Sequence, residues 1–156
     1  MFSILPTLAQ VGALVVLGLV VGSMFGIWRG YDITTYSADT FIDVHQGAVR
    51  GLNTLLPALA AASLVLVLIL GVMARNRPAV LGLYAATALA IIAGGIITRL
   101  LNQPINDQVM AWTIGSIPAD WSSLRDRWWT WHQARLAVTL GAQLLLIAAI
   151  FADRDA

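Results

Sequence analysis

The chain has 156 residues, of which 59% are hydrophobic and 11% are charged, and its formal net charge is +1. An average soluble domain has about 25% charged residues, so this composition indicates an integral membrane protein whose surroundings are a lipid bilayer. The near-neutral charge argues against nucleic acid as a partner, because such proteins present a clustered basic face. The sequence contains no cysteine, which excludes disulfides and thiolate metal sites.

Four apolar runs are long enough, or nearly so, to cross a hydrocarbon layer of about 30 Å, which takes about 20 helical residues. They predict membrane helices at residues 8–28, 55–74, 79–98 and 130–151. No Lys or Arg precedes the first run, so we interpret it as a retained membrane helix and not as a signal peptide. The predicted fold class is all-α: one domain over residues 1–156, an integral membrane four-helix bundle with a polar, tryptophan-rich cap formed by the two long loops on one face.

The first predicted helix carries a stripe of glycines at every fourth position. These are Gly18, Gly22, Gly26 and Gly30. Small residues at this spacing let a second helix approach to backbone contact. The stripe therefore either packs inside the bundle or, through Gly18, Gly22 and Gly26, forms the seam of a homodimer, and the sequence does not separate these two interpretations.

The polar connection after the first helix contains a short amphipathic helix that Ser37 can cap. Its polar stripe comprises Asp39, Asp43, Gln46 and Arg50. His45 lies four residues after Phe41 and three after Ile42, so it shares the apolar face and is expected to turn towards the bundle. Whether this helix fuses with the second membrane helix is left open, because Gly51 and Pro57 both favour a kink or a fresh start.

The second and third membrane helices are joined by a short hairpin at residues 75–78, which contains Arg75 and Arg77. By the positive-inside rule this hairpin is cytoplasmic, and four spans then place both termini on the same side, most simply of a plasma membrane. The longer loops on the other side also contain arginines, so the charge asymmetry is small.

Two asparagines bracket a proline just beyond the third membrane helix, in the order Asn102, Pro104 and Asn106. This pattern predicts a rigid turn whose amides lie at the rim of a pocket. A loop follows, and Asp120 or Ser122 is the expected N-cap of the last helix.

The last helix carries one polar stripe at helical spacing. It comprises His132, Arg135, Thr139 and Gln143. Each unpaired polar group costs several kcal/mol in hydrocarbon, so these side chains should face a protein interior or a wet cavity. The apolar run of residues 136–151 is too short to span the hydrocarbon layer alone, so the membrane helix must include part of the preceding segment. This places His132 and Arg135 at the hydrocarbon boundary.

All six tryptophans fall on the predicted long-loop face, together with both histidines and both asparagines of the predicted turn. The tryptophans are at positions 28, 112, 121, 128, 129 and 131. The hairpin face has none of these residues, so we expect the functional site on the long-loop face. A simpler role for Trp and Arg at this depth is an interfacial belt with extended Arg side chains.

The second half of the chain, from about Arg99 to Ile150, resembles the anthrone oxygenase-like family of small four-helix membrane proteins. The resemblance rests on the segments at residues 102–107, 117–121 and 127–135. It implies a single four-helix domain and, in members with an assigned role, oxygenation of a polycyclic phenolic anthrone to an anthraquinone without a bound flavin or haem. The residues that match the family pattern are Asn102, Asn106, Trp128, Trp131, His132 and Arg135, whereas His45 matches less clearly.

Oxygenation of an anthrone without a cofactor needs a base that forms the carbanion and donors that hold its oxyanion. The sequence-based hypothesis makes His132 the base, with Arg135, Asn102 and Asn106 as donors and His45 as a further catalytic residue. The predicted substrate-binding residues are Trp128, Trp131, Arg127, Trp112 and Thr139. The predicted ligand is a hydrophobic small molecule.

Two alternatives stay open from the sequence. His45 and His132 with Asp43 or Asp107 would resemble a two-His, one-carboxylate iron site, and copper would be the other candidate metal, although no paired metal-ligand spacing is present. The second alternative is that the chain is a non-enzymatic bundle that binds a partner or acts as a structural subunit. An enzyme requires a cavity at His132 and Arg135, whereas a structural subunit would fill that space with side chains.

Overall fold

A computed structural model describes residues 4–154, and within that range the chain is helical throughout except for short connections. The elements in chain order are α1 (Ile4–Gly30), the 3-10 turn η1 (Ile33–Thr35), α2 (Ala38–Leu52), α3 (Leu55–Met73), α4 (Pro78–Ile97), the π-helical segment η2 (Thr98–Asn102), α5 (Gln103–Met110) and α6 (Trp121–Arg154). Four helices are long and apolar enough to cross a membrane. The predicted all-α membrane bundle is therefore confirmed.

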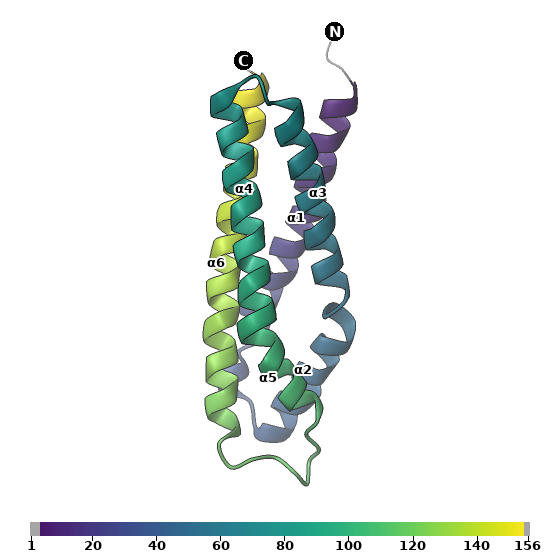
Figure 1. The fold of residues 1–156 in the computed structure, drawn as a ribbon. Coiled ribbons are helices and arrows are strands. Elements are labelled where there is room, and N and C mark those ends of the chain that lie inside the picture. The colour runs from purple at the N-terminus through teal and green to yellow at the C-terminus, as the bar shows by residue number, and fades with distance from the viewer. Residues whose placement is uncertain (1–3, 155–156) are drawn as a thin grey trace.

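The long helices form an up-and-down bundle in which α1 contacts α3 and α6, and α4 contacts α3 and α6 (Figure 1). The two chain ends and the α3–α4 hairpin lie at one end of the bundle, whereas α2 and α5 lie at the other (Figure 1). The last helix has 34 residues, about 51 Å at about 1.5 Å per residue, and so extends well beyond a hydrocarbon layer. Its first turns, which begin directly after Asp120, contain the tryptophan-rich segment.

A polar clamp fastens the hairpin end of the bundle. Arg77 forms an ion pair with Asp153 and also donates to the Asp153 backbone oxygen at 3.0 Å. Gln10 donates to the other side-chain oxygen of Asp153 at 2.7 Å. The clamp thus joins the start of α1, the hairpin and the end of α6, next to the main apolar core.

The two short helices α2 and α5 form a cap over the opposite end of the bundle. Ser37 caps α2 as predicted, accepting a hydrogen bond from the Thr40 amide, and His45 is buried as predicted. The α2–α3 boundary is a break at Asn53 and Thr54, so the two helices do not fuse. Gln46, which belongs to the predicted polar stripe, ties the cap by donating to the backbone oxygens of Val109 and Trp112 at 2.9 and 3.0 Å.

The predicted rigid turn around Pro104 is wrong, because α4 continues through η2 into α5 without leaving a helical path. In the π-helical segment the Gln103 amide bonds to the Thr98 oxygen, five residues back. Pro104 lies just beyond this segment, and the wider π turn accommodates its ring within the continuing helix. The two asparagines therefore project from a continuous helix.

The glycine stripe of α1 does not pack inside the bundle, which corrects one of its two interpretations. A Cβ atom added at Gly18, Gly22, Gly26 or Gly30 would meet no atom within 4 Å among the described residues. Backbone approach by a neighbouring helix would have given short distances there. The homodimer seam through Gly18, Gly22 and Gly26 stays a prediction.

The close approach of helices α4 and α6 depends on Gly94. A Cβ added there would lie 2.9 Å from the Thr139 hydroxyl, which donates to the Arg135 backbone oxygen at 2.7 Å. We expect Gly94→Ala to lower the free energy of unfolding by about 1–3 kcal/mol, because the helices must shift apart. The thermal unfolding midpoint in detergent measures this.

The matched control for this substitution is Gly82→Ala on the same helix, where an added Cβ meets no atom within 4 Å. We expect no loss of stability there, because alanine has the higher helix propensity. Equal unfolding midpoints for the two variants would contradict the close approach at Gly94.

Candidate functional site

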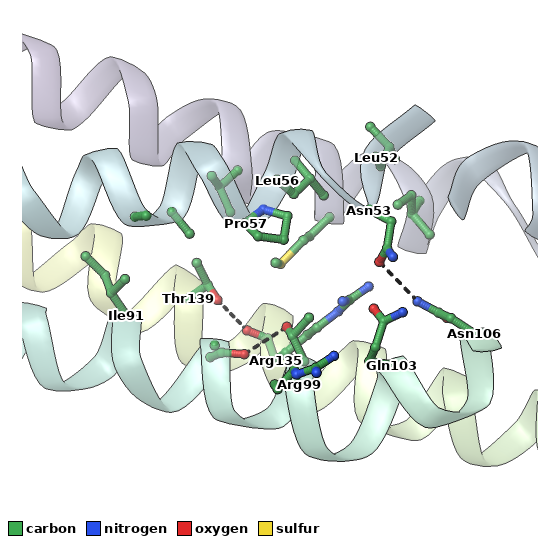
Figure 2. A pocket seen from close by; sticks show the side chains of 18 of the residues that line it. Leu52, Asn53, Leu56, Pro57, Ile91, Arg99, Gln103, Asn106, Arg135 and Thr139 are labelled. Carbon is green, nitrogen blue, oxygen red and sulfur yellow. Dashed lines mark hydrogen bonds between the residues drawn. The ribbon is translucent and has the colours of Figure 1, made fainter. Parts of the chain in front are cut away.

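A cavity of about 490 Å³ lies in the bundle interior at the end covered by the cap (Figure 2). Its walls are apolar residues of α1, α3 and α4, and polar groups concentrate at one end. The polar lining residues are His45, Asn53, Thr98, Arg99, Gln103, Asn106, Arg135 and Thr139. An apolar pocket of this size with a few convergent polar groups is the usual form of a small-molecule site.

Arg135 lies in the cavity wall as a buried cation, with 7% of its surface exposed. Its Nε and Nη2 atoms donate to the Nδ1 atom of His132 at 3.3 and 3.0 Å, and its guanidinium lies 5.8 Å from the centre of the Trp128 ring. Within residues 4–154 no carboxylate lies within ion-pair distance of it. A buried cation that lacks a counter-ion favours an anion or an oxyanion beside it.

The hydrogen bonds of His132 fix its protonation state and remove it from the cavity. Because arginine is a donor only, Nδ1 of His132 must be the acceptor, and Nε2 must then carry the proton that it donates to the Met24 oxygen at 3.0 Å. The side chain is fully buried and is not among the lining residues. Both nitrogens of His132 are thus engaged in hydrogen bonds within the bundle, and the side chain joins Arg135 to α1. The role of His132 as the base stays a prediction from the sequence.

His45 has the arrangement that was expected of His132. The indole N–H of Trp128 donates to Oδ1 of Asn106 at 2.7 Å, which identifies that atom as the amide oxygen. Nε2 of His45, 3.2 Å from the same oxygen, must therefore be protonated. Burial favours the neutral ring, in which Nδ1 has a free lone pair, and no residue between 4 and 154 donates to that nitrogen. His45 lines the cavity, where an unprotonated imidazole nitrogen can act as a base.

Aromatic rings hold His45 and the cation at the same end of the cavity. The His45 ring lies 4.8 Å from the Trp128 ring and 5.1 Å from the Phe41 ring, measured between centroids. Trp128 is thus in contact with both His45 and Arg135, and it lines the cavity itself. Of the tryptophans assigned to the substrate wall, Trp128 is the one whose position supports that assignment.

The structure places the other predicted site residues as follows. Asn106 and Thr139 line the cavity, whereas Asn102 is fully buried behind the wall and donates to the Trp128 backbone oxygen at 3.1 Å. Three predicted substrate-binding residues do not line the cavity: Trp131 and Arg127 are exposed, and Trp112 packs in the apolar cluster beneath the cap. Trp131 and Arg127 thus hold positions that suit an interfacial belt.

Sequence reasoning missed four polar residues of the cavity: Asn53, Thr98, Arg99 and Gln103. Asn53 accepts a hydrogen bond from Asn106 at 3.5 Å, as Figure 2 shows, while Arg99 and Gln103 line the cavity from η2 and α5. Arg99 and Gln103 precede Asn106 at helical spacing, a signal that the predicted turn at Pro104 concealed, whereas no spacing connects Asn53 to the other site residues. Only the packing of α2, α3 and α5 brings them together.

A metal site at these histidines is not assembled. Within the part of the chain that the structure describes, no group of three or more His, Asp or Glu side chains could hold a metal ion. Asp43 and Asp107, the proposed carboxylate ligands, are exposed, whereas His45 and His132 are buried on either side of Trp128. These residues do not fit the iron or copper site that the sequence left as an alternative.

We expect purified protein to contain far less than one iron or copper atom per chain, because the two histidines share no carboxylate ligand. Inductively coupled plasma mass spectrometry of the detergent-solubilised protein, prepared without chelators, measures this. The His45→Ala and His132→Ala variants are the controls. Stoichiometric metal that disappears in either variant would contradict this interpretation.

The fold and the site together define a four-helix integral membrane protein with an interior, aromatic-walled cavity that contains a buried cation and a neutral histidine. The chain belongs to the anthrone oxygenase family, whose model matches residues 46–145. The matched region includes Asn106, Trp128 and Arg135, and it begins one residue after His45. No curated protein and no solved structure gives a significant match.

Proposed function

We propose that this protein is a membrane oxygenase that converts an anthrone-type polycyclic phenol to the corresponding quinone in the cavity beneath the cap. One observation carries the proposal: an unprotonated imidazole nitrogen and a buried cation without a counter-ion line the same apolar cavity. Membership of the anthrone oxygenase family supports the oxygenase class.

In the proposed reaction dioxygen is the oxidant. Nδ1 of His45 removes a proton from the methylene carbon of the anthrone, and the resulting negative charge lies on the ring carbonyl oxygen next to Arg135. The carbanion adds to dioxygen, and the peroxide takes up the proton. Loss of the remaining hydrogen at that carbon with cleavage of the O–O bond releases water, so anthrone and O₂ give anthraquinone and H₂O. The electrons that reduce dioxygen come from the substrate.

The cavity suits such a substrate in size and polarity. Its volume of about 490 Å³ lies within the range of about 300–1,000 Å³ that small-molecule sites occupy. Apolar side chains such as Leu17, Val20 and Ile91 line the part away from Arg135, where aromatic rings would lie. A structural subunit would fill this volume with side chains, so the cavity supports an enzyme over a non-enzymatic bundle.

The proposed topology places both termini and the hairpin in the cytoplasm, with the cap at the opposite face of a plasma membrane. Arg75 and Arg77 in the hairpin support this orientation. The cap contains no comparable short basic loop.

The test is an oxygenase assay of the protein in proteoliposomes with anthrone as the substrate. We expect dioxygen consumption and anthraquinone formation in a one-to-one ratio, and one atom of label in the product when ¹⁸O₂ is supplied. Protein-free liposomes give the background oxidation. A rate that does not exceed this background for anthrone and its hydroxylated forms would overturn the proposed function.

A further inference from the structure

The exposed part of the cavity lining lies on α3, α4 and the start of η2. Its exposed lining residues lie on two facing helices: Pro57 and Ala61 on α3, and Ile92, Gly95 and Arg99 on α4 and the start of η2. The lining residues contributed by α1 and α6 are buried. We call the gap between the exposed residues of α3 and those of α4 and η2 the lateral opening.

The cap seals the cavity on the water side. Gln46 joins α2 to α5 and to the connection after it through two hydrogen bonds to backbone oxygens. Beneath the cap, Phe41 is fully buried and its ring lies 5.7 Å from that of Trp121. These contacts pack α2, α5 and the start of α6 together over this end of the cavity.

The lateral opening lies within the hydrocarbon layer. Ala61 is six residues beyond Leu55, the first residue of α3, which places it about 9 Å along the helix axis. Gly95 lies four residues before Arg99, or about 6 Å towards the membrane centre. An arginine at this depth can extend its charge to the headgroups while its stem remains in hydrocarbon. The opening thus faces the acyl chains of the cap-side leaflet.

The two helices diverge only in this part of the bundle. Near the hairpin, α3 and α4 run close together (Figure 1). A Cβ added at Gly71 would lie 3.6 Å from that of Tyr84. Towards the cap they separate, and the facing positions on the rim carry the small residues Ala61 and Gly95. Neither residue carries a side chain larger than a methyl group, so small groups border the lateral opening here.

We propose that a flat polycyclic aromatic substrate dissolved in the bilayer enters the cavity sideways, through the lateral opening between α3 and α4. This inference rests on the proposed function for the identity of the substrate. Arg99 at the rim meets the phenolic oxygens first, and Arg135 receives the ring oxygen inside. The membrane thus concentrates the apolar substrate at the opening, and the cap never has to open.

The test measures the rate at which a product-like ligand enters the cavity. The probe is 1,8-dihydroxyanthraquinone, added to proteoliposomes, and its binding is followed by quenching of tryptophan fluorescence, because Trp128 lines the cavity. Ala61→Phe and Gly95→Phe each narrow the opening. Ala62→Phe is the control, since Ala62 is exposed on the same helix but does not line the cavity.

We expect both narrowing variants to slow association and dissociation together, by about tenfold or more, with Kd changed less than about threefold, and the control to be unaffected. A phenylalanine ring that only filled the cavity would instead weaken binding of the ligand and so raise Kd. Circular dichroism and the unfolding midpoint verify the fold of each variant. One folded narrowing variant is enough to test lateral entry.

Rates that are unchanged in both folded narrowing variants would overturn lateral entry. Binding with slowed rates but no dioxygen consumption would support lateral entry and overturn the proposed oxygenase reaction. If the unsubstituted protein showed no quenching by the ligand at all, with lipid filling the cavity instead, both proposals would fail.

Discussion

Replacing His45 by alanine is expected to lower kcat/KM for anthrone by about 10²–10⁴-fold, the range that a general base contributes. The reason is that Nδ1 of His45 is the unprotonated nitrogen at the cavity wall, because Asn106 fixes the proton on Nε2. Anthraquinone formation in proteoliposomes measures the effect. Binding of 1,8-dihydroxyanthraquinone should change little, since the substitution leaves the apolar walls intact.

A second variant and a rescue separate catalysis from packing. His45→Gln retains a donor for Asn106 but supplies no base, so it should lose as much activity as the alanine variant. Added imidazole should restore activity to His45→Ala, where the missing ring leaves space, and not to His45→Gln. A glutamine variant that keeps more than about a third of the activity would contradict the role of His45 as the base.

Replacing Arg135 by methionine is expected to lower kcat by about 10²–10³-fold, the usual effect of losing an oxyanion donor. The guanidinium is buried in the cavity wall and has no carboxylate partner in the described part of the chain, so the developing oxyanion is its natural counter-ion. Steady-state rates of anthrone oxidation in proteoliposomes measure the change.

The same substitution should cost little stability. It leaves Nδ1 of His132 without a donor, which costs about 1–3 kcal/mol, but it also removes a buried, unpaired charge whose desolvation was unfavourable. We therefore expect an unfolding midpoint close to that of the unsubstituted protein. Arg135→Lys keeps the charge and should recover part of the activity. If the methionine variant were unfolded, or active at the original rate, the proposed role of Arg135 would be wrong.

The bundle itself could be predicted from the sequence because hydrocarbon imposes strict rules. Every backbone amide in lipid must bond within the chain, so long apolar runs can only be helices. The same argument predicted that Arg135 and Thr139 face an interior cavity, where the structure places both. Burial of His45 was also predictable, because it shares a helix face with Phe41.

The different positions of the two histidines could not be predicted in the same way. His132 and Arg135 are three residues apart, which at about 100° per residue places their side chains roughly 60° apart around the helix. That difference turns His132 towards Met24 in the α1 interface and leaves Arg135 at the cavity. A helical stripe is too coarse a description to separate these positions.

Two other features depend on contacts between distant segments. The orientation of His45 is set by Asn106 and Trp128, which lie far along the chain, so no local spacing reveals it. Similarly, Trp128 and Trp131 look equivalent in sequence, yet one is buried beside His45 and the other is exposed. Their positions around α6 relative to its neighbours decide which can touch a ligand.

The π-helical segment η2 has a consequence for how this site can change over evolution. A π turn holds one residue more than an α turn, so one additional residue in Thr98–Asn102 is absorbed there while α5 keeps its orientation relative to α4. In a regular α-helix one additional residue would instead rotate α5 by about 100° about its axis, and Asn106 would point away from His45. The group that fixes the tautomer of His45 therefore depends on the π-helical geometry of η2 as well as on the identity of Asn106.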